Sequence, residues 1–428
     1  MSKSKTFPMF DWAKKLFPWH RSLSGQGTYD TLVFLSNINK NLKIKNFKSG
    51  TKCFDWVVPK EWIIKDAYLE HQSGKRFCEI KQNNLHIVQY SKPINKIINI
   101  KDLKKNIFYL NRRPKSIPYV TSYYRENWGF CMTFNQFKKL PKGNYKAYIN
   151  SKLQKGKINY GEIVLKGKSK KEIFFSTYVC HPSMANNELS GPIVAIALSK
   201  YLSELNKKQL NYSYRFIFIP ETIGAIAYIN KELKKLKKNV ICGVNLSCVG
   251  DGRAYSMISS RLGNTLADSA LRASLKYKKN FKIYDYLERG SDERQFCSPG
   301  VNLPFCGFSR SKYYEYPEYH TSDDNLKIIS QKNLEDSLDV VKDIVNVFEK
   351  KLYPRAKFIC EPKMDKRNLY DPLSKDKNYL KKSLRNRMDF LSYADGEHTF
   401  FDIVNRCNFS LQEGHKIYDL LKYNKLIR

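Results

Sequence analysis

The stretch EIFFSTYVCHPSMANNELSGPIVAIALSKYLSEL, residues 172–205, carries the clearest indication of the fold class. Its first part is a continuous apolar run rich in strand-forming residues, and its last part, from Gly191, has the composition of a buried helix. Between them lies a polar turn that begins with His181. A buried strand that leads through a short turn into a buried helix is the repeating unit of an α/β domain.

The same alternation continues downstream of this stretch. The pattern predicts buried strands at 214–220 and 239–250, and helices at 221–236, 265–275 and 333–352. Apolar strands that alternate with helices favour a largely parallel sheet. Ligands of such sheets bind beyond the carboxyl ends of the strands.

The segments outside this alternation have other patterns of apolar and polar residues. Helical spacing of apolar residues is found at 11–17 and 28–42. Residues 355–379 are polar and Lys-rich and are typical of a linker, and 380–428 contain three short amphipathic helices with the rhythm of a winged helix. Short β-like segments separated by turn residues predict a small β-rich module; they lie at 53–58, 62–70, 76–80 and 85–90.

The composition narrows the class of protein. The chain has 428 residues, 42% of them hydrophobic, which is ordinary for a globular protein. Lys and Arg number 76 against 40 Asp and Glu, for a net charge of +36. The basic residues are spread along the chain, so we favour a general compositional bias over a nucleic-acid footprint, which would be clustered.

No apolar run reaches the roughly 18 residues that a membrane span needs. The ten cysteines show no CxxC spacing, and several lie in apolar segments. This pattern predicts reduced, buried thiols in a cytoplasmic protein.

Histidine and carboxylates gather where the predicted strands end. His181 follows the first strand and Glu221 follows the second. Asp292, Arg294, Tyr319 and His320 follow later in the chain. Imidazoles that hold a zinc ion beside a free carboxylate are the requirement for metal-assisted hydrolysis. Taken singly, each of these residues is as well explained by a structural hydrogen bond or a helix cap.

Taken together and in this order, these motifs resemble the zinc aminopeptidase superfamily of the phosphorylase/hydrolase-like fold. The resemblance is closer to a bacterial family of aminopeptidase-like proteins of unknown function, which have a β-rich insertion and a winged-helix tail. It covers nearly the whole chain. The motifs are HRSLSGQGT (20–28), FDWVVPKEW (54–62), IPYVTSYYRENWGFC (117–131), CHPSMANNELSG (180–191), PETIGAIAY (220–228), SCVGDGRAY (247–255), SDERQFCSPGVNLP (291–304) and EYHTSDDN (318–325).

The resemblance implies a role for each matching residue. His181 and His320 match ligands to the two metal ions of the superfamily, and Glu221 matches the general base. Asn187 stands where the superfamily has a bridging Asp. The resemblance also implies a place in surface polysaccharide biosynthesis, because genes for such relatives are often found beside genes of that pathway.

The departures from the superfamily pattern bear on the metal. Thr222 and Ser247 stand where two further carboxylate ligands are usual, and Asn187 is neutral. The resemblance therefore implies one zinc ion or none. Three alternatives stay open: one zinc on His181, His320 and an oxygen of Asn187, Glu221 or Asp292; a metal-free binding pocket; or a structural remnant.

Other residues near the expected pocket have two explanations each. Asp292 and Arg294 can bind a substrate amine and carboxylate, or pair with one another. Tyr319 can stabilise an oxyanion or simply pack. Asp323 or Asp324 can orient His320 or cap a helix.

We therefore expect an α/β fold with an aminopeptidase-like mixed sheet flanked by helices. Its function would be zinc-dependent hydrolysis of a small peptide or an aminoacyl or amino-sugar conjugate; the alternative is a non-catalytic binding or regulatory protein. Nucleic acid is not the favoured partner. The predicted divisions are core residues 1–49, an inserted β-rich domain at 50–125, core residues 126–354, a linker at 355–379 and a winged-helix-like domain at 380–428.

Overall fold

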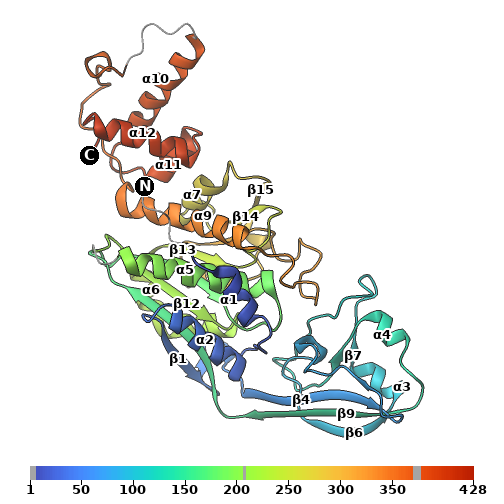
Figure 1. Cartoon of the computed structure of the whole chain (residues 1–428). Coiled ribbons are helices and arrows are strands. Elements are labelled where there is room, and N and C mark those ends of the chain that lie inside the picture. The colour runs from blue at the N-terminus through green and yellow to red at the C-terminus, as the bar shows by residue number, and fades with distance from the viewer. Residues whose placement is uncertain (1–5, 206–208, 370–376) are drawn as a thin grey trace.

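The computed structural model describes residues 6–205, 209–369 and 377–428. It consists of a central α/β core, a β-rich module at one end of the core and a small helical domain that carries the C-terminus (Figure 1). Within these described ranges, none of the helices has the length and apolar character needed to cross a membrane.

The main sheet is mixed, with a parallel centre. In the described part of the chain its eight strands lie in the order β1-β10-β12-β11-β13-β16-β14-β15. The pairs β12–β11, β11–β13 and β13–β16 are parallel, whereas β10 and β14 join this centre antiparallel. The carboxyl ends of β11, β12 and β13 therefore meet at one edge. The strands are β1 (Lys43–Lys48), β10 (Lys157–Leu165), β11 (Glu172–Tyr178), β12 (Ser213–Ile219), β13 (Val240–Leu246), β14 (Tyr255–Ile258), β15 (Phe281–Tyr284) and β16 (Phe305–Ser309).

Helices cover both faces of this sheet, and all the helices predicted from apolar spacing are present. One face packs under α1 (Met9–Leu16), α2 (Gln26–Ile38), α5 (Ser190–Leu205), α7 (Leu266–Leu275) and α9 (Gln331–Lys350). The other face packs under α6 (Ile223–Asn239) and α8 (Glu293–Phe296). The predicted strands at 172–180, 214–220 and 239–250 correspond to β11, β12 and β13.

The β-rich module is built on a four-stranded sheet in the order β5-β4-β9-β6. Its two long strands, β4 (Glu61–His71) and β9 (Asn144–Gln154), pair antiparallel, and β9 leads directly into β10 of the core. Its apolar residues join the buried cluster beneath α6, so the module shares a core with the α/β domain. Its shorter elements are β2 (Lys52–Cys53), β3 (Trp56–Val57), β5 (Arg76–Phe77), η1 (Asn84–His86), β6 (Ile94–Asn99), α3 (Ile100–Leu103), η2 (Lys104–Asn106), β7 (Ile107–Phe108), β8 (Phe130–Cys131) and α4 (Phe134–Lys138).

The prediction of a strand at 85–90 was wrong. Asn83 accepts a hydrogen bond from the backbone N–H of Leu85 and starts the short 3₁₀ turn η1. From Leu85 to Tyr90 every side chain is buried, so the segment runs through the interior instead of alternating between two faces. The hydrophobic residues here reflect burial on all sides and not a strand period.

The C-terminal domain contains α10 (Lys377–Ser392), α11 (Phe400–Arg406) and α12 (Leu411–Tyr423). It is fixed to α7 of the core: Ser269 donates a hydrogen bond to Asp402 (2.7 Å), and Lys276 donates to the carbonyl of Val404 (2.9 Å). Residues 370–376 of the predicted linker lie outside the described residues. The domain boundaries remain a prediction.

Candidate active site

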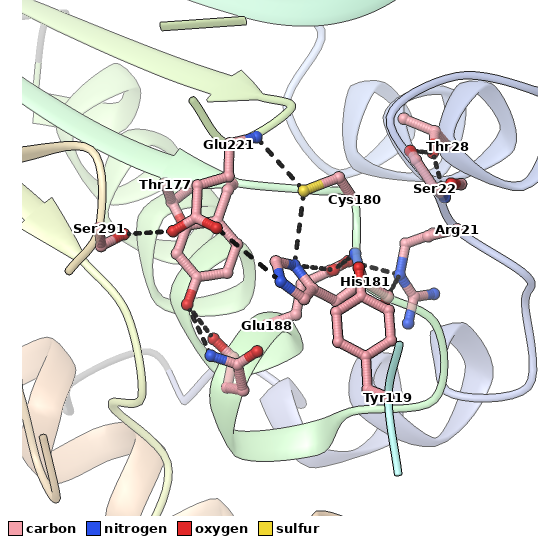
Figure 2. A network of polar contacts seen from close by, with 12 residues as sticks. Arg21, Ser22, Thr28, Tyr119, Thr177, Cys180, His181, Glu188, Glu221 and Ser291 are labelled. Atoms are coloured by element: carbon pink, nitrogen blue, oxygen red, sulfur yellow. Dashed lines mark hydrogen bonds and ion pairs between the residues drawn. The ribbon is translucent and has the colours of Figure 1, made fainter. Parts of the chain in front are cut away.

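Three residues that follow different strands converge at the carboxyl edge of the sheet. His181 follows β11, Glu221 follows β12, and His320 lies between β16 and α9. The Nε2 atom of His181 lies 3.9 Å from the Oε2 atom of Glu221 (Figure 2), and the rings of His181 and His320 have centroids 5.4 Å apart. These are the three residues that the sequence placed at the centre of the pocket.

The backbone around this centre adopts an uncommon conformation at several residues. Positive φ angles occur at Ser183 (48°), Thr222 (64°), Cys248 (54°) and His320 (54°). None of these residues is glycine, and a side chain in this region of φ costs of order 1–3 kcal/mol. Such strain is characteristic of functional sites, where the surrounding structure holds the chain in place.

Buried polar atoms without partners gather at the same place. In the described part of the chain, His320 Nε2, Asn187 Oδ1 and Asp292 Oδ2 are buried and accept or donate no hydrogen bond. Buried polar groups are nearly always paired, so unpaired ones indicate a place for a ligand, an ion or water. Asn187 is held by its other side-chain atom, because Nδ2 donates to the hydroxyl of Tyr178 at 2.8 Å.

The turn that carries Asn187 is fixed by Asp324. This turn, η3 (Ala185–Leu189), is π-helical. The Asp324 carboxylate accepts hydrogen bonds from the backbone N–H groups of Ala185, Asn186 and Asn187 at 2.7–3.0 Å. Burial raises the pKa of Asp324 to about 6, although these hydrogen bonds oppose the rise.

Of the two alternatives open for Asp323 and Asp324, orientation of His320 is made by neither residue, and Asp324 instead accepts the N–H groups at the start of η3. Asp324 is engaged by η3, and Asp323 pairs with Arg113 at 2.7 Å. Burial and then the neighbouring His181 hold the pKa of His320 well below its ordinary value, so its imidazole is neutral.

Glu221 is held at the mouth of the site. Its carboxylate accepts a hydrogen bond from the hydroxyl of Ser291 at 2.9 Å, and its backbone N–H donates to the Cys180 thiol at 3.3 Å (Figure 2). Its side chain is 21% exposed, so solvent can reach it. Burial raises the pKa of Glu221, while the charges of His181 and Arg294 oppose the rise.

Asp292 and Arg294 converge on Thr222 and not on one another. Asp292 Oδ1 accepts a hydrogen bond from the backbone N–H of Thr222 (2.8 Å), and Arg294 Nη2 donates to the Thr222 hydroxyl (2.5 Å). Burial, and then the charge of Glu221, raise the pKa of Asp292 well above its ordinary value. The guanidinium thus lies against the residue that replaces the second Glu of the superfamily pattern.

A buried ion pair behind His181 was not found from the sequence. Arg21 and Glu188 are both fully buried, and Arg21 Nε donates to Glu188 Oε1 at 2.5 Å (Figure 2). Glu188 Oε2 accepts a very short hydrogen bond from the backbone N–H of His181 and lies 3.4 Å from its Nδ1 atom. The carboxylate therefore faces the side of the imidazole that points away from Glu221.

Cys180, His181 and Glu188 offer ligand atoms within 4.8 Å of one another. Both oxygens of Glu188 already have protein partners, however, and the Arg21 charge opposes a cation beside them. This group is better suited to orient the His181 ring than to hold a metal. The signal in the sequence was the acidic residue directly after Asn187 in CHPSMANNELSG, to which we gave no role from the sequence.

The β-rich module closes one side of the site with aromatic rings. The Tyr119 ring lies 5.0 Å from the rings of both His181 and His320, and its backbone N–H donates to the carbonyl of His320 at 2.9 Å. Tyr319 stacks on His320 with centroids 3.9 Å apart. Ser247 is buried at the end of β13. The site therefore lies between the sheet edge and the module.

Comparison with known proteins was made on the whole chain. Residues 10–351 match the family model described as a domain of unknown function, DUF4910. The chain belongs to the DUF4910 family. Residues 351–428 match a model described as a winged helix-turn-helix, so the C-terminal helices form a winged-helix domain. This match begins earlier than the predicted boundary at 380.

Relatives of this DUF4910 chain extend over nearly its full length. A Clostridium acetobutylicum protein named "Putative polysaccharide biosynthesis protein with aminopeptidase-like domain" is 36% identical over 422 residues, which cover 98% of this chain and 96% of that protein. A crystal structure titled as a putative peptidase from the same organism has a TM-score of 0.88 at 34% identity and covers 98% of this chain and 95% of that one.

A zinc aminopeptidase from Bacillus subtilis shows the wider fold. It has a TM-score of 0.58 at 14% identity, over 80% of this chain and 93% of that chain. The aminopeptidase-like fold that the sequence motifs implied is thereby confirmed.

Proposed function

We propose that this DUF4910 protein is a hydrolase of aminopeptidase type that uses a single zinc ion and cleaves an amide bond in a peptide or an amino-sugar conjugate. The observation that carries the proposal is the convergence of His181, Glu221 and His320 at a strained sheet edge beside unpaired buried polar atoms. The names of the Clostridium acetobutylicum relatives agree with a peptidase-like activity and with a polysaccharide pathway.

The donor set fits one zinc ion. His320 Nε2 and Asn187 Oδ1 are buried and without partners, and His181 Nε2 faces Glu221 at 3.9 Å, beyond hydrogen-bonding distance. Two imidazoles and one oxygen leave the open position that a catalytic zinc site needs. When bound, zinc would polarise the scissile carbonyl and make water more acidic.

The same geometry argues against a second ion. Thr222 offers no carboxylate, and its hydroxyl is taken by Arg294 at 2.5 Å. A guanidinium at this point places positive charge where a second cation would need a negative ligand. We therefore assign Arg294 to the substrate, with Asp292 beside it.

Glu221 would act as the base. Its carboxylate is fixed by Ser291, exposed enough to reach water and raised in pKa by burial, and a base is most effective when its pKa approaches the working pH. It would take a proton from the attacking water and return it to the leaving amine. Tyr319 and Tyr119 would form the wall on which the substrate rests.

The second candidate is a binding protein without catalysis, and it is favoured by the neutral residues at Asn187, Thr222 and Ser247.

All ten cysteines lie in the described residues, all are free and eight are buried, which supports the cytoplasm as the compartment.

One experiment separates the two candidates. Elemental analysis of protein purified without added zinc or chelator should give close to one zinc per chain. Hydrolysis of aminoacyl test substrates should then fall by about 10²–10⁴-fold in Glu221→Gln, with zinc content unchanged. Zinc content near zero together with no turnover would favour the binding protein. Equal turnover in Glu221→Gln would remove Glu221 as the base.

A further inference from the structure

A groove lies in the β-rich module, beside the Tyr119–Tyr123 pair that borders the candidate active site. Its volume is about 480 Å³. It is bounded by the end of the β2–β3 hairpin and the residues that follow it, by the segment 122–126 and by the turn after β9. No residue of this groove takes part in the reaction proposed above.

The groove and the active site share a wall. Tyr123 lines the groove, and its hydroxyl is hydrogen-bonded to that of Tyr119 at 2.6 Å. The ring of Tyr119 contacts both His181 and His320 with centroids 5.0 Å apart in each case. The Tyr119–Tyr123 pair therefore links the groove to these histidines, and a substrate that extends past this pair would contact both.

The groove combines an apolar floor with a cationic rim. Val57 and Tyr124 line it and remain 52% and 58% exposed, and Tyr124 packs edge-on against Trp56 at 5.2 Å. Large apolar side chains left open in a groove indicate a ligand with an apolar body.

The rim carries three cations from three separate segments. Lys60 follows the hairpin, Arg125 lies in the segment 122–126, and Lys155 lies in the turn after β9. In the described part of the chain, none of the three has a carboxylate within 4.0 Å, and Glu126 is the one acidic residue that lines the groove. Arg and Lys that converge without partners suit a carboxylate or phosphate.

We propose that this groove binds the part of the substrate remote from the scissile bond, and that this part is an anionic group, carboxylate or phosphate, carried on a ring or another flat apolar body. The place of this group in a substrate rests on the proposed hydrolase function, whereas its binding to the groove does not. The substrate class is thereby narrowed to acidic conjugates.

Binding of small probes tests the groove without any turnover. The probes are 4-acetamidobenzoate and phenyl phosphate, which carry the two anions on a ring, and acetanilide, which is the neutral counterpart. Dissociation constants are measured by NMR titration at one ionic strength on the full chain. Lys60→Gln/Arg125→Gln should weaken at least one anionic probe by about tenfold or more and leave acetanilide unchanged.

A matched variant controls for the overall positive charge. Lys166→Gln/Lys170→Gln removes the same charge from the exposed loop before β11. This loop lies at the end of β11 remote from His181, so all three dissociation constants should stay unchanged. The proposal is overturned if this control weakens the anions equally, or if wild type binds acetanilide as well as the anions. The anion that responds identifies carboxylate or phosphate.

The outcome is independent of catalysis. Glu221→Gln should bind the anionic probes as wild type does. If the probes bind but no aminoacyl substrate is hydrolysed, the groove assignment stands and the hydrolase proposal fails. If hydrolysis occurs but the anions do not bind, the hydrolase proposal stands and the groove assignment fails.

Discussion

In the described part of the chain, two arginines, Arg21 and Arg215, are completely buried, and they differ in how their donors are used. Arg215 in β12 has no donor group without a partner. It pairs with Glu172 at 2.6 and 2.9 Å through Nε and Nη2, and its Nη1 donates to Glu162 and to the Tyr228 hydroxyl, both at 2.7 Å.

Arg21 is buried to the same degree but is incompletely satisfied. Its Nε binds Glu188 and the carbonyl of His181, and its Nη1 binds the carbonyl of Leu16, while Nη2 has no partner in the described residues. This difference indicates that the Arg215 network stabilises the fold, whereas the Arg21 network positions residues of the candidate site. Of the charged or ionisable side chains with an orphaned buried atom in the described part, all but His415 lie around the candidate centre, namely Arg21, Asp292, Arg294 and His320.

The largest effect is expected from deleting either arginine charge. Arg215→Met and Arg21→Met each leave buried carboxylate charge uncompensated, and each should lower the free energy of unfolding by about 3–5 kcal/mol. Only Arg21→Met should also weaken zinc binding, because only Arg21 holds Glu188 against His181. Urea denaturation of the metal-free proteins and zinc titration of the folded ones measure the two quantities. Equal loss of zinc affinity in both variants would erase the distinction between the networks.

Removing both members of the Arg21 pair separates stability from positioning. Arg21→Met/Glu188→Leu leaves no uncompensated charge, so most of the stability lost in Arg21→Met should return. Zinc affinity should stay reduced by about 10–100-fold, because partners that orient a ligating imidazole typically contribute that much. The same zinc titration provides the measurement. Recovery of zinc affinity together with stability would make the pair purely structural.

The pattern of the sequence was sufficient for much of the fold and for the centre of the site. The strands β11, β12 and β13 and the helices α5, α6, α7 and α9 follow from apolar runs, whereas β14, β15 and β16 were not predicted. His181 and Glu221 were found because ligands gather at strand ends. His320 and Asn187 came from the motif resemblance. Such signals are local, or are carried by short motifs.

The rest depended on contacts between distant residues. Arg21 and Glu188 are 167 residues apart in the sequence, and no local pattern around either residue predicts their pairing. The 85–90 segment was misread because a buried strand and a buried irregular segment both give an apolar run. That Asn187 directs Nδ2 to Tyr178 and leaves Oδ1 free is a matter of rotamer, which no sequence pattern specifies.

A smaller effect, opposite in sign, is expected at Asn187. Asn187→Asp places a negative oxygen where a neutral one has no partner, and should raise zinc affinity by about tenfold. If zinc currently draws Glu221 into its coordination, the new carboxylate should also release that base and raise turnover on aminoacyl substrates. Zinc titration of wild type and variant at one pH measures the change.

The alternative for Asn187 is a purely structural role in η3. Asn187 lies inside this turn, and Asp lacks the Nδ2–H that donates to Tyr178, so the substitution would then lower stability and leave zinc affinity and turnover unaltered. That result would remove Asn187 from the metal site and would favour the binding protein over the hydrolase.

The smallest effect concerns the acid limb of stability and belongs to the Arg215 network. Burial raises the pKa of Glu162, but hydrogen bonds from Lys45 and Tyr228 and the charge of Arg215 outweigh burial and hold that pKa below its ordinary value. A carboxyl with a depressed folded-state pKa stabilises the fold fully above its unfolded pKa of about 4.3, and this contribution is lost as pH falls through the lower folded value. Glu162→Gln should therefore flatten the fall in unfolding free energy of the metal-free protein below about pH 4.3. Urea titrations across this range, with the exposed Glu361→Gln as control, measure the slope. A slope that Glu162→Gln leaves unchanged, or that Glu361→Gln flattens equally, would mean that the Glu162 carboxylate is not a source of the acid sensitivity of the fold.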